Sequence, residues 1–306
     1  MTNNVDGKVF VVKVDDRKYG LRTVLDQFHI DEYSGKKVAL KANYNSADPF
    51  PASTHSDTLE ALVSQLREAG AKELTFAERS GMGNTRDVLM QTGVLELSRR
   101  LGFKVVVLDE LGREGWVKIE KKGTHWLRGF FIPKIFLEAD KVVQTCCLKT
   151  HRFGGHFTIS LKNSVGLVAK KVPGGLYDYM WELHESPYQR LMIAEINRYY
   201  NVDLVVMDAL RAFVNKGPEE GDIVEPNLIL ASRDRIAMDA VGVAILRSYG
   251  STENVMRGRI FELDQIRRAA DLGVGVKSAS EMELVSLNKE SQSITKKLQD
   301  ILKREG

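Results

Sequence analysis

Cysteine is scarce in this sequence of 306 residues, which contains only Cys146 and Cys147. Adjacent cysteines rarely bridge each other, because the ring that the bond would close is strained. The pair supplies no disulfide framework, so the sequence favours a reducing compartment. An iron–sulfur cluster normally needs four cysteine ligands, and this chain alone cannot supply them.

Long hydrophobic runs are also lacking. The first ten residues, MTNNVDGKVF, contain no apolar stretch of signal-peptide length. Nowhere does the sequence reach the run of about 18 apolar residues that a transmembrane helix needs. We therefore expect a cytoplasmic protein that has no membrane partner.

A large excess of one charge is absent as well. The 44 basic and 41 acidic residues give a net charge of +3. Proteins dedicated to nucleic acids usually show a basic excess, so we do not expect nucleic acid as a partner. Hydrophobic residues make up 43% and charged residues 28%, which is normal for a globular protein with a real core. A local basic cluster does occur, around Lys162, Lys170 and Lys171.

What the sequence does contain is an alternation of apolar, strand-length runs with segments of helical periodicity. Strands are expected at residues 8–14, 37–42, 73–77, 103–108, 141–147, 203–207 and 227–231. Helices are expected at residues 56–69, 87–101, 189–200 and 235–246. The strands lack clean period-two alternation, which favours an α/β fold with a mostly parallel sheet and helices on both faces.

The expected domain organisation is an α/β core over residues 1–280, as one unit or as two lobes with an insertion around 110–185. Residues 281–306 are expected to form a C-terminal helix. Leu298, Ile301 and Leu302 form an apolar strip on it. We interpret the strip as a face that packs on the core. The alternative is a dimer contact, and the oligomeric state stays open.

The densest polar segment follows the expected strand at 141–147. It carries Lys149, His151, His156, Lys162 and Asn163, interleaved with glycines. In mostly parallel sheets, ligands bind outside the carboxyl ends of the strands. Lysine binds phosphate or carboxylate, or serves as an amine whose pKa falls on burial. Histidine transfers protons near neutral pH or binds a metal. The segment therefore predicts one wall of an active or ligand-binding site.

Other strand ends add candidates. Asn43 follows the second expected strand, and Asp208 follows the sixth as a possible site carboxylate. Ser56 or Thr54 is expected to cap the helix at 56–69. Glycines near residue 81 lack the spacing of a dinucleotide fingerprint and indicate a simple connection.

The expected helix at 235–246 has two acidic residues of its own. Asp234 is placed to cap its first turn. Asp239 lies on a mostly apolar helix and needs a partner if it is buried, so we interpret it as a structural contact.

These residues, in this order, resemble the family called domain of unknown function 362. The likeness spans roughly residues 38–246. Its most specific part consists of two segments, Cys147-Leu148-Lys149-Thr150-His151 and Leu161-Lys162-Asn163-Ser164-Val165-Gly166. The supporting matches are Lys41-Ala42-Asn43, Asp208, Gly217, Pro218, Gly221, Asp234 and Asp239. From this set we add Gly217, Pro218 and Asp234 as candidate ligand-binding residues.

The chain departs from the family pattern in two ways. It has Cys146-Cys147-Leu148 where the family commonly has a proline before the lysine. It also lacks the ferredoxin-like module of many members, so the resemblance does not imply electron transfer through built-in clusters. The family is distantly similar to the N-terminal part of nickel-pincer lactate racemase, which uses histidine proton transfer and a lysine-tethered cofactor on 2-hydroxy acids. A likeness of folds alone implies no reaction.

Three functions remain open at this point. In the first, an enzyme holds a small anionic substrate with Lys149 and Lys162, and His151 moves a proton. Asn43, Asn163 and Asp208 would orient the substrate or His151, which predicts that Asp208 shares one pocket with the lysines and the histidine.

The second function is a carrier of a divalent metal or cofactor that works with a redox (iron–sulfur) partner protein. His151 and His156 would bind the metal, with Asp208 as a further ligand. The third is an assembly factor that acts through the C-terminal helix. The cofactor, if any, is unknown from the sequence.

Overall fold

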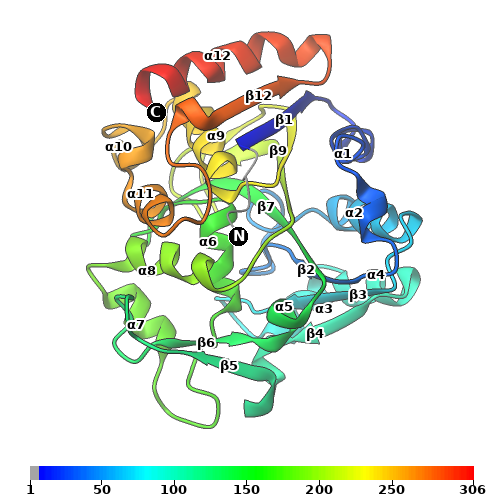
Figure 1. The fold of residues 1–306 in the computed structure, drawn as a ribbon, viewed down its shortest axis with the longest axis vertical. Coiled ribbons are helices and arrows are strands. Elements are labelled where there is room, and N and C mark those ends of the chain that lie inside the picture. Colours follow the sequence, from blue (N-terminus) through cyan, green and yellow to red (C-terminus); the bar gives the residue numbers. More distant parts are fainter. Residues whose placement is uncertain (1–6) are drawn as a thin grey trace.

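A mostly parallel sheet runs through the centre of the protein. The structure is a computed structural model, and it describes residues 7–306. Within that range the main sheet has ten strands, with β12-β1-β11-β9-β7-β2-β3-β4 as its path (Figure 1). Along this path only β11 is antiparallel to its neighbours. The predicted α/β class is confirmed.

The path strands are β1 (Gly7–Lys13), β2 (Lys37–Lys41), β3 (Glu73–Glu78), β4 (Lys104–Val107), β7 (Lys141–His151), β9 (Leu204–Phe213), β11 (Leu228–Ser232) and β12 (Met282–Ser286). Two short strands extend their neighbours: β8 (His156–Thr158) pairs with β7, and β10 (Ile223–Val224) pairs with β9. A separate hairpin consists of β5 (Trp116–Ile119) and β6 (Phe130–Pro133). The hairpin falls inside the insertion expected around residues 110–185.

Helices cover both faces of the sheet (Figure 1). One face packs on α1 (Arg17–Leu25), α2 (Ser56–Glu68), α3 (Thr85–Gln91) and α4 (Val94–Leu101). The other packs on α6 (Ser160–Asn163), α8 (Gln189–Ile196), α9 (Arg235–Ser248), α10 (Glu253–Met256), α11 (Asp264–Asp271) and α12 (Lys289–Glu305). The β5–β6 hairpin, α5 (Lys134–Glu138) and α7 (Tyr179–Glu185) pack together with α8 in a third apolar cluster. None of the helices within residues 7–306 is long and apolar enough to cross a membrane.

The order of the strands creates a topological switch point between β2 and β7. From β2 the chain continues to β3 and β4 on one side, and it later returns to place β7 on the other side. Both neighbours are parallel to β2, so the carboxyl ends of these strands share one edge. Connections leave such a pair in opposite directions, which opens a crevice there.

Three predicted boundaries are wrong in an informative way. The helix expected at 87–101 is two helices, because Gly93 adopts a left-handed φ of 76° between α3 and α4. The strand expected to stop at residue 147 continues to His151, since β8 folds back and pairs with it. His55, rather than Ser56 or Thr54, caps α2 by accepting a hydrogen bond from the Asp57 backbone N–H.

The C-terminal segment is not only a helix. Its first part is β12, which pairs with β1 at the edge of the main sheet. In α12, Leu298, Ile301 and Leu302 are buried in the same apolar cluster as α9. The strip therefore packs on the core, as predicted. It is covered within the chain and is not the exposed dimer contact that the assembly-factor hypothesis needs.

Candidate functional site

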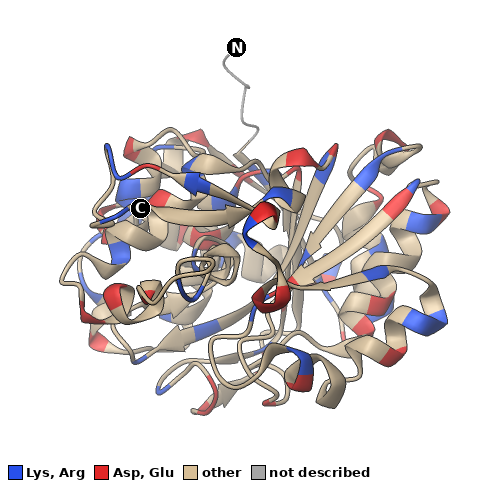
Figure 2. Cartoon of the chain, turned by 90° about the horizontal axis from the view of Figure 1, so that it is seen from below, with Lys and Arg blue, Asp and Glu red and all other residues tan. Residues whose placement is uncertain are grey.

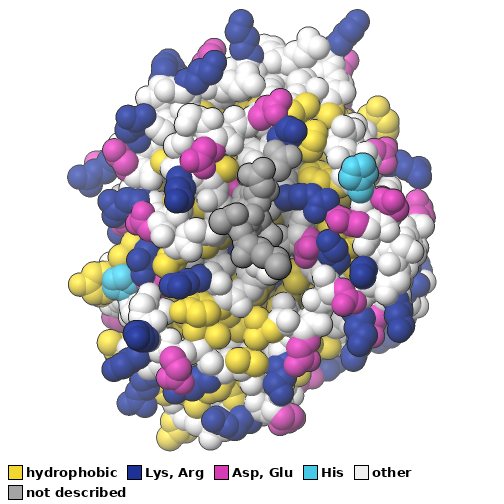
Figure 3. All heavy atoms as spheres, viewed as in Figure 1, with side chains coloured by type: hydrophobic (Ala, Val, Ile, Leu, Met, Phe, Trp, Pro, Cys, Tyr) yellow, Lys and Arg dark blue, Asp and Glu magenta, His cyan; other side chains and the backbone are white. Residues whose placement is uncertain are grey.

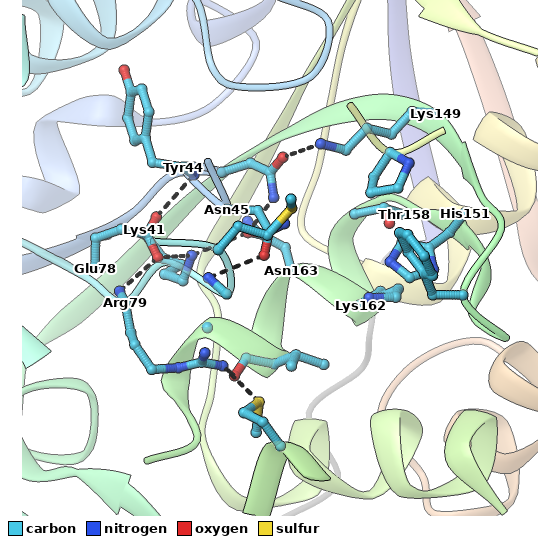
Figure 4. A pocket seen from close by; sticks show the side chains of 18 of the residues that line it. Lys41, Tyr44, Asn45, Glu78, Arg79, Lys149, His151, Thr158, Lys162 and Asn163 are labelled. Carbon is cyan, nitrogen blue, oxygen red and sulfur yellow. Dashed lines mark hydrogen bonds and ion pairs between the residues drawn. The ribbon is translucent and has the colours of Figure 1, made fainter. Parts of the chain in front are cut away.

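A cavity of about 290 Å³ lies at the carboxyl ends of β2, β3 and β7, at the topological switch point (Figure 4). The residues that line it are Lys41, Asn43, Tyr44, Asn45, Glu78, Arg79, Gly81, Met82, Lys149, His151, Phe153, Thr158, Lys162, Asn163, Val165, Gly166, Met180, His184 and Pro218. This is where the strand-end rule predicts a ligand site.

A buried ion pair joins two neighbouring strands at one end of the cavity. Lys41 and Glu78 are the last residues of β2 and β3, and Lys41 Nζ lies 2.7 Å from Glu78 Oε1. Their side chains are 2% and 1% exposed. Burial raises the pKa of Glu78 and lowers that of Lys41, while their mutual attraction opposes both shifts. Glu78 also accepts hydrogen bonds from the backbone N–H groups of Tyr44 and Arg79, which stabilise the carboxylate.

Two asparagines connect this ion pair to the next strand (Figure 4). Asn163 Oδ1 accepts hydrogen bonds from Lys41 Nζ at 3.1 Å and from Asn43 Nδ2 at 3.3 Å. Asn43 Oδ1 in turn accepts one from Lys149 Nζ at 2.8 Å. The asparagines therefore orient lysines rather than the histidine, which refines the role predicted for Asn43 and Asn163.

The three cavity lysines differ in how many N–H donors they have left. An ammonium group has three donors. Lys41 uses all of them, on Glu78, Asn163 and the Ala42 carbonyl. Lys149 uses two, on Asn43 and the Ala52 carbonyl. Lys162 has no hydrogen bond or ion pair with any of residues 7–306. Lys41 is thus structural, whereas Lys149 and Lys162 have donors for a ligand.

Lys162 lies beside His151 and Thr158 at one end of the cavity (Figure 4). His151 Nδ1 and Thr158 Oγ1 are buried and have no hydrogen-bond partner among the described residues. Burial, reinforced by the charges of Lys162 and Lys149, lowers the pKa of His151 well below its usual 6.5. Burial and the nearby Lys149 and Arg79 also lower the pKa of Lys162 to about 7. Unpartnered polar atoms of this kind indicate a place prepared for a ligand.

Gly155 makes the close approach of these two side chains possible. A Cβ atom at this position would lie 2.4 Å from Lys162 Cε and 3.1 Å from His151 Nδ1. Both atoms therefore face the same point of the turn between β7 and β8, and only glycine leaves that point empty.

We expect Gly155→Ala to weaken ligand binding at the cavity by about tenfold, because the added methyl group displaces the flexible end of Lys162. The displaced atoms belong to a mobile side chain, so the urea midpoint of unfolding should change little. Calorimetric titration with a small anion measures the first effect. Unchanged affinity would mean that the position of Lys162 is unimportant for binding.

The cavity carries an excess of positive charge. Its described lining has four lysine and arginine side chains, Lys41, Arg79, Lys149 and Lys162, and one carboxylate, Glu78. On the face drawn in Figure 3, in contrast, basic and acidic side chains are intermixed, and the two charge types also alternate along the chain (Figure 2). Because Glu78 is already paired with Lys41, the remaining cations favour an anionic ligand.

The short helix α6 holds Lys162 and Asn163 in place. Asp239 of α9 accepts hydrogen bonds from the backbone N–H groups of Ser160 and Leu161, at 2.8 and 3.2 Å. Burial raises the pKa of Asp239 to about 7. The prediction that this aspartate makes a structural contact is confirmed, and its partner is a different helix from its own.

The residues of the cavity fall within a known family pattern. Residues 38–244 match the family described as Domain of unknown function (DUF362). The match covers more than half of the chain and includes every residue of the cavity lining. The chain belongs to the DUF362 family.

Two further similarities accompany this match. Thylakoid-associated protein sll1697 from Synechocystis sp. is 26% identical over 218 residues, which are 70% of this chain and 64% of that protein. This chain therefore spans less than two thirds of that relative. The lactate racemase apoprotein from Thermoanaerobacterium thermosaccharolyticum is similar in structure, with a TM-score of 0.46 and 17% identity, over 75% of this chain and 54% of that one. Neither similarity assigns a reaction to this DUF362 protein.

Most of the predicted site residues meet in the cavity. The structure brings together Lys149, His151, Lys162, Asn43, Asn163 and Pro218. Gly217 stands just behind the lining and packs against the end of β7, where its backbone N–H donates to Thr150 Oγ1. It positions Pro218 rather than a ligand.

The prediction that Asp208 shares this pocket is wrong. Strand β9 continues to Phe213, so Asp208 lies inside the strand and not after it. Its carboxylate is buried against the face covered by α1 and α2, where Arg17 Nε lies 2.6 Å away and Thr58 donates a hydrogen bond. Asp208 therefore anchors these helices to the sheet.

A ligand-binding role was also predicted for Asp234, but this residue does not lie at the cavity. Since β11 is antiparallel to its neighbours, its carboxyl end lies at the opposite edge of the sheet from the cavity. There Asp234 caps α9 by accepting hydrogen bonds from the backbone N–H groups of Ile236 and Ala237, and it accepts a third from Val276. The capping role predicted for it is confirmed.

The predicted metal site lacks ligands. His156 pairs with His151 across the β7–β8 hairpin, but it is not part of the cavity lining. Among residues 7–306, no three His, Cys, Asp or Glu side chains are grouped as a metal site requires. Asp208 points to the other side, so the structure provides no third ligand near His151.

The segment that begins with Glu78 and Arg79 was interpreted from the sequence as a simple connection, and Lys41 was treated only as part of a motif. The signal was present, because a lysine and a glutamate end two neighbouring buried strands. Charges at such positions need partners, and the carboxyl edge of the sheet supplies them. Met180 and His184, from α7, gave no signal because nothing in the sequence places that helix against the cavity.

Proposed function

We propose that this protein binds a small anionic compound in the cavity at the carboxyl ends of β2, β3 and β7 and catalyses a proton transfer on it. Lys149 and Lys162 hold the anion, and His151 gives or takes the proton. The observation that carries the proposal is the set of unused polar atoms: the Lys162 amine and His151 Nδ1 have no partners among residues 7–306.

The protonation states support these roles. A histidine with a strongly lowered pKa is neutral near pH 7 and offers both a lone pair and an N–H. Such a ring accepts a proton at one nitrogen and donates one from the other, and an anion bound nearby raises its pKa toward the working pH. The buried ion pair and the asparagines hold Lys41 and Lys149 in place, and no carboxylate among the described residues forms an ion pair with Lys149 or Lys162. An anion completes the charge balance of the cavity.

We expect Lys162→Met to weaken the binding of oxalate or inorganic phosphate by roughly 10- to 100-fold, the value of one charge-assisted hydrogen bond of about 1.5–3 kcal/mol. Calorimetric titration near pH 6.5 measures it. The matched control is Lys171→Met, since Lys171 is exposed and does not line the cavity. If neither anion binds to the wild-type protein, or if both variants bind equally, the proposal is wrong.

The anion affinity measured by this titration should also depend on pH. The pKa of Lys162 is about 7, so its ammonium form is lost as the pH rises above that value. Affinity for the anion should then fall by up to about tenfold for each pH unit. Lys162→Met should remove most of this dependence.

We also propose that the protein works in a reducing compartment such as the cytoplasm. Cys146 and Cys147 are both free and buried in β7. Burial raises the pKa of both thiols, so they are in the unreactive, protonated form.

A further inference from the structure

We propose that Lys162 is a nucleophile that forms an imine with an aldehyde or ketone carrying an anionic group. The proposal rests on the proposed function, because the anionic group is held by the same cavity. It names the substrate class: a small carbonyl compound with a carboxylate or a phosphate.

The first argument is the isolation of the Lys162 amine. Lys41 is fully used by internal partners, and Lys149 is tied to Asn43 and Ala52. Lys162 makes no such contact within residues 7–306, although it lies in a cavity that holds Glu78. An amine with no internal partner can bind an anion in its charged form, and in its neutral form its nitrogen lone pair is unobstructed, as a nucleophile requires.

The second argument is the charge around it. Lys149 and Arg79 are the cations that disfavour an ammonium group on Lys162, in addition to desolvation by burial. A lysine that is desolvated beside another cation is activated as an amine nucleophile at neutral pH. The same neighbours have donors for an anion: Lys149 has one N–H unused, and the buried Arg79 Nε has no partner among the described residues.

The third argument is the position of a proton carrier. His151 Nδ1 and Lys162 Cε both face the empty side of Gly155, and Thr158 Oγ1 lies at the same end of the cavity without a partner. Imine formation needs proton transfers at the nitrogen and at the carbonyl oxygen. A neutral histidine and a hydroxyl group are the side chains that can perform them.

The step balances without any further reagent. The lone pair of the neutral Lys162 amine attacks the carbonyl carbon, and the π electrons of the C=O bond move to oxygen, which takes a proton from solvent water. The nitrogen gives up a proton to His151. His151 then returns this proton to the hydroxyl group, which leaves as water while the C=N bond forms. The nitrogen keeps its second proton, so the product is a protonated imine and its positive charge is balanced by the hydroxide left in solvent. Nothing is oxidised or reduced, and the protonated imine is an electron sink for loss of a proton from the neighbouring carbon.

The test is reductive trapping on the intact protein. Wild-type protein is incubated with pyruvate or with dihydroxyacetone phosphate in the presence of sodium cyanoborohydride, and the adduct is located by peptide mass mapping. We expect one adduct, on Lys162. The probe that is trapped in higher yield shows whether the preferred anionic group is a carboxylate or a phosphate. Lys162→Arg keeps the positive charge but should reduce the yield to background, while Lys171→Arg at the exposed site should leave it unchanged.

The pH dependence of trapping provides a second readout. Since the neutral amine reacts, the rate of imine formation should rise between about pH 6 and pH 8, with its midpoint near the Lys162 pKa of about 7. For an ordinary lysine with a pKa of 10.5, the rate of imine formation would still be rising at pH values well above this range. Anion binding should show the opposite trend over the same range.

The outcomes separate the two proposals. If oxalate or phosphate binds but no adduct forms on Lys162, the imine proposal is overturned and the anion site stands. If adducts are spread over surface lysines, or if Lys162→Arg is labelled as efficiently as wild type, the imine proposal is also overturned. If no anion binds and no adduct forms, both fail.

Discussion

His151→Ala slows imine formation at Lys162 by a factor of about 100 or more, with little change in the final yield of trapped adduct. This is the result we expect, because general acid–base catalysis by a positioned side chain contributes about 100- to 10,000-fold. His151 carries protons and does not itself bond to the carbonyl carbon, so its removal changes the rate rather than the site of reaction. The measurement is the time course of trapping with saturating pyruvate.

The variant should fold. His151 Nδ1 has no hydrogen bond within residues 7–306, so alanine breaks none at that atom. His29→Ala is the matched control, because His29 is exposed and lies outside the cavity lining. A rate for His151→Ala equal to that of His29→Ala would exclude His151 as the proton carrier.

The second large effect concerns stability. We expect Glu78→Ala to reduce the free energy of unfolding by about 3–5 kcal/mol, because it leaves the Lys41 ammonium buried without its partner. The two side chains are almost completely buried and 2.7 Å apart. Urea denaturation measures the effect as a lower midpoint at an unchanged slope.

An exposed ion pair provides the control for this prediction. Arg22 and Glu68 lie 3.4 Å apart, and both side chains are more than half exposed. Glu68→Ala should cost less than about 1 kcal/mol. In addition, replacing both members of the buried pair, by Lys41→Met with Glu78→Leu, should recover part of the loss. Equal losses for Glu78→Ala and Glu68→Ala would show that the buried pair contributes no more than a surface one.

Much of the fold was predictable because apolar periodicity reports on burial. The predicted first residue of each central strand lies within a few residues of the observed one. The mostly parallel direction of the strands followed from their uniform hydrophobicity. Strand ends were less predictable. Nothing local in the sequence shows that β7 continues to His151, because the pairing with β8 that extends it depends on the turn at Gly154 and Gly155.

The candidate site was predictable where it depends on the position of residues in the sequence. It was not predictable where it depends on the length and direction of strands. Lys149, His151 and Lys162 were found because a dense polar segment after a buried strand needs a functional explanation. Asp208 and Asp234 were misassigned for geometric reasons: β9 is longer than its apolar run, and β11 runs in the opposite direction. Strand direction is a property of the whole sheet, and a single segment does not encode it.

The reversed direction of β11 places the cap of α9 and the cavity at opposite edges of the sheet. Because β11 ends at the opposite edge, the capping of α9 by Asp234 is remote from the loops that form the cavity. Substitutions in the loops after β2, β3 and β7 therefore leave that cap undisturbed. Variants that probe the proposed site can therefore be made at one edge of the sheet, while the contacts at the other edge keep α9 in place.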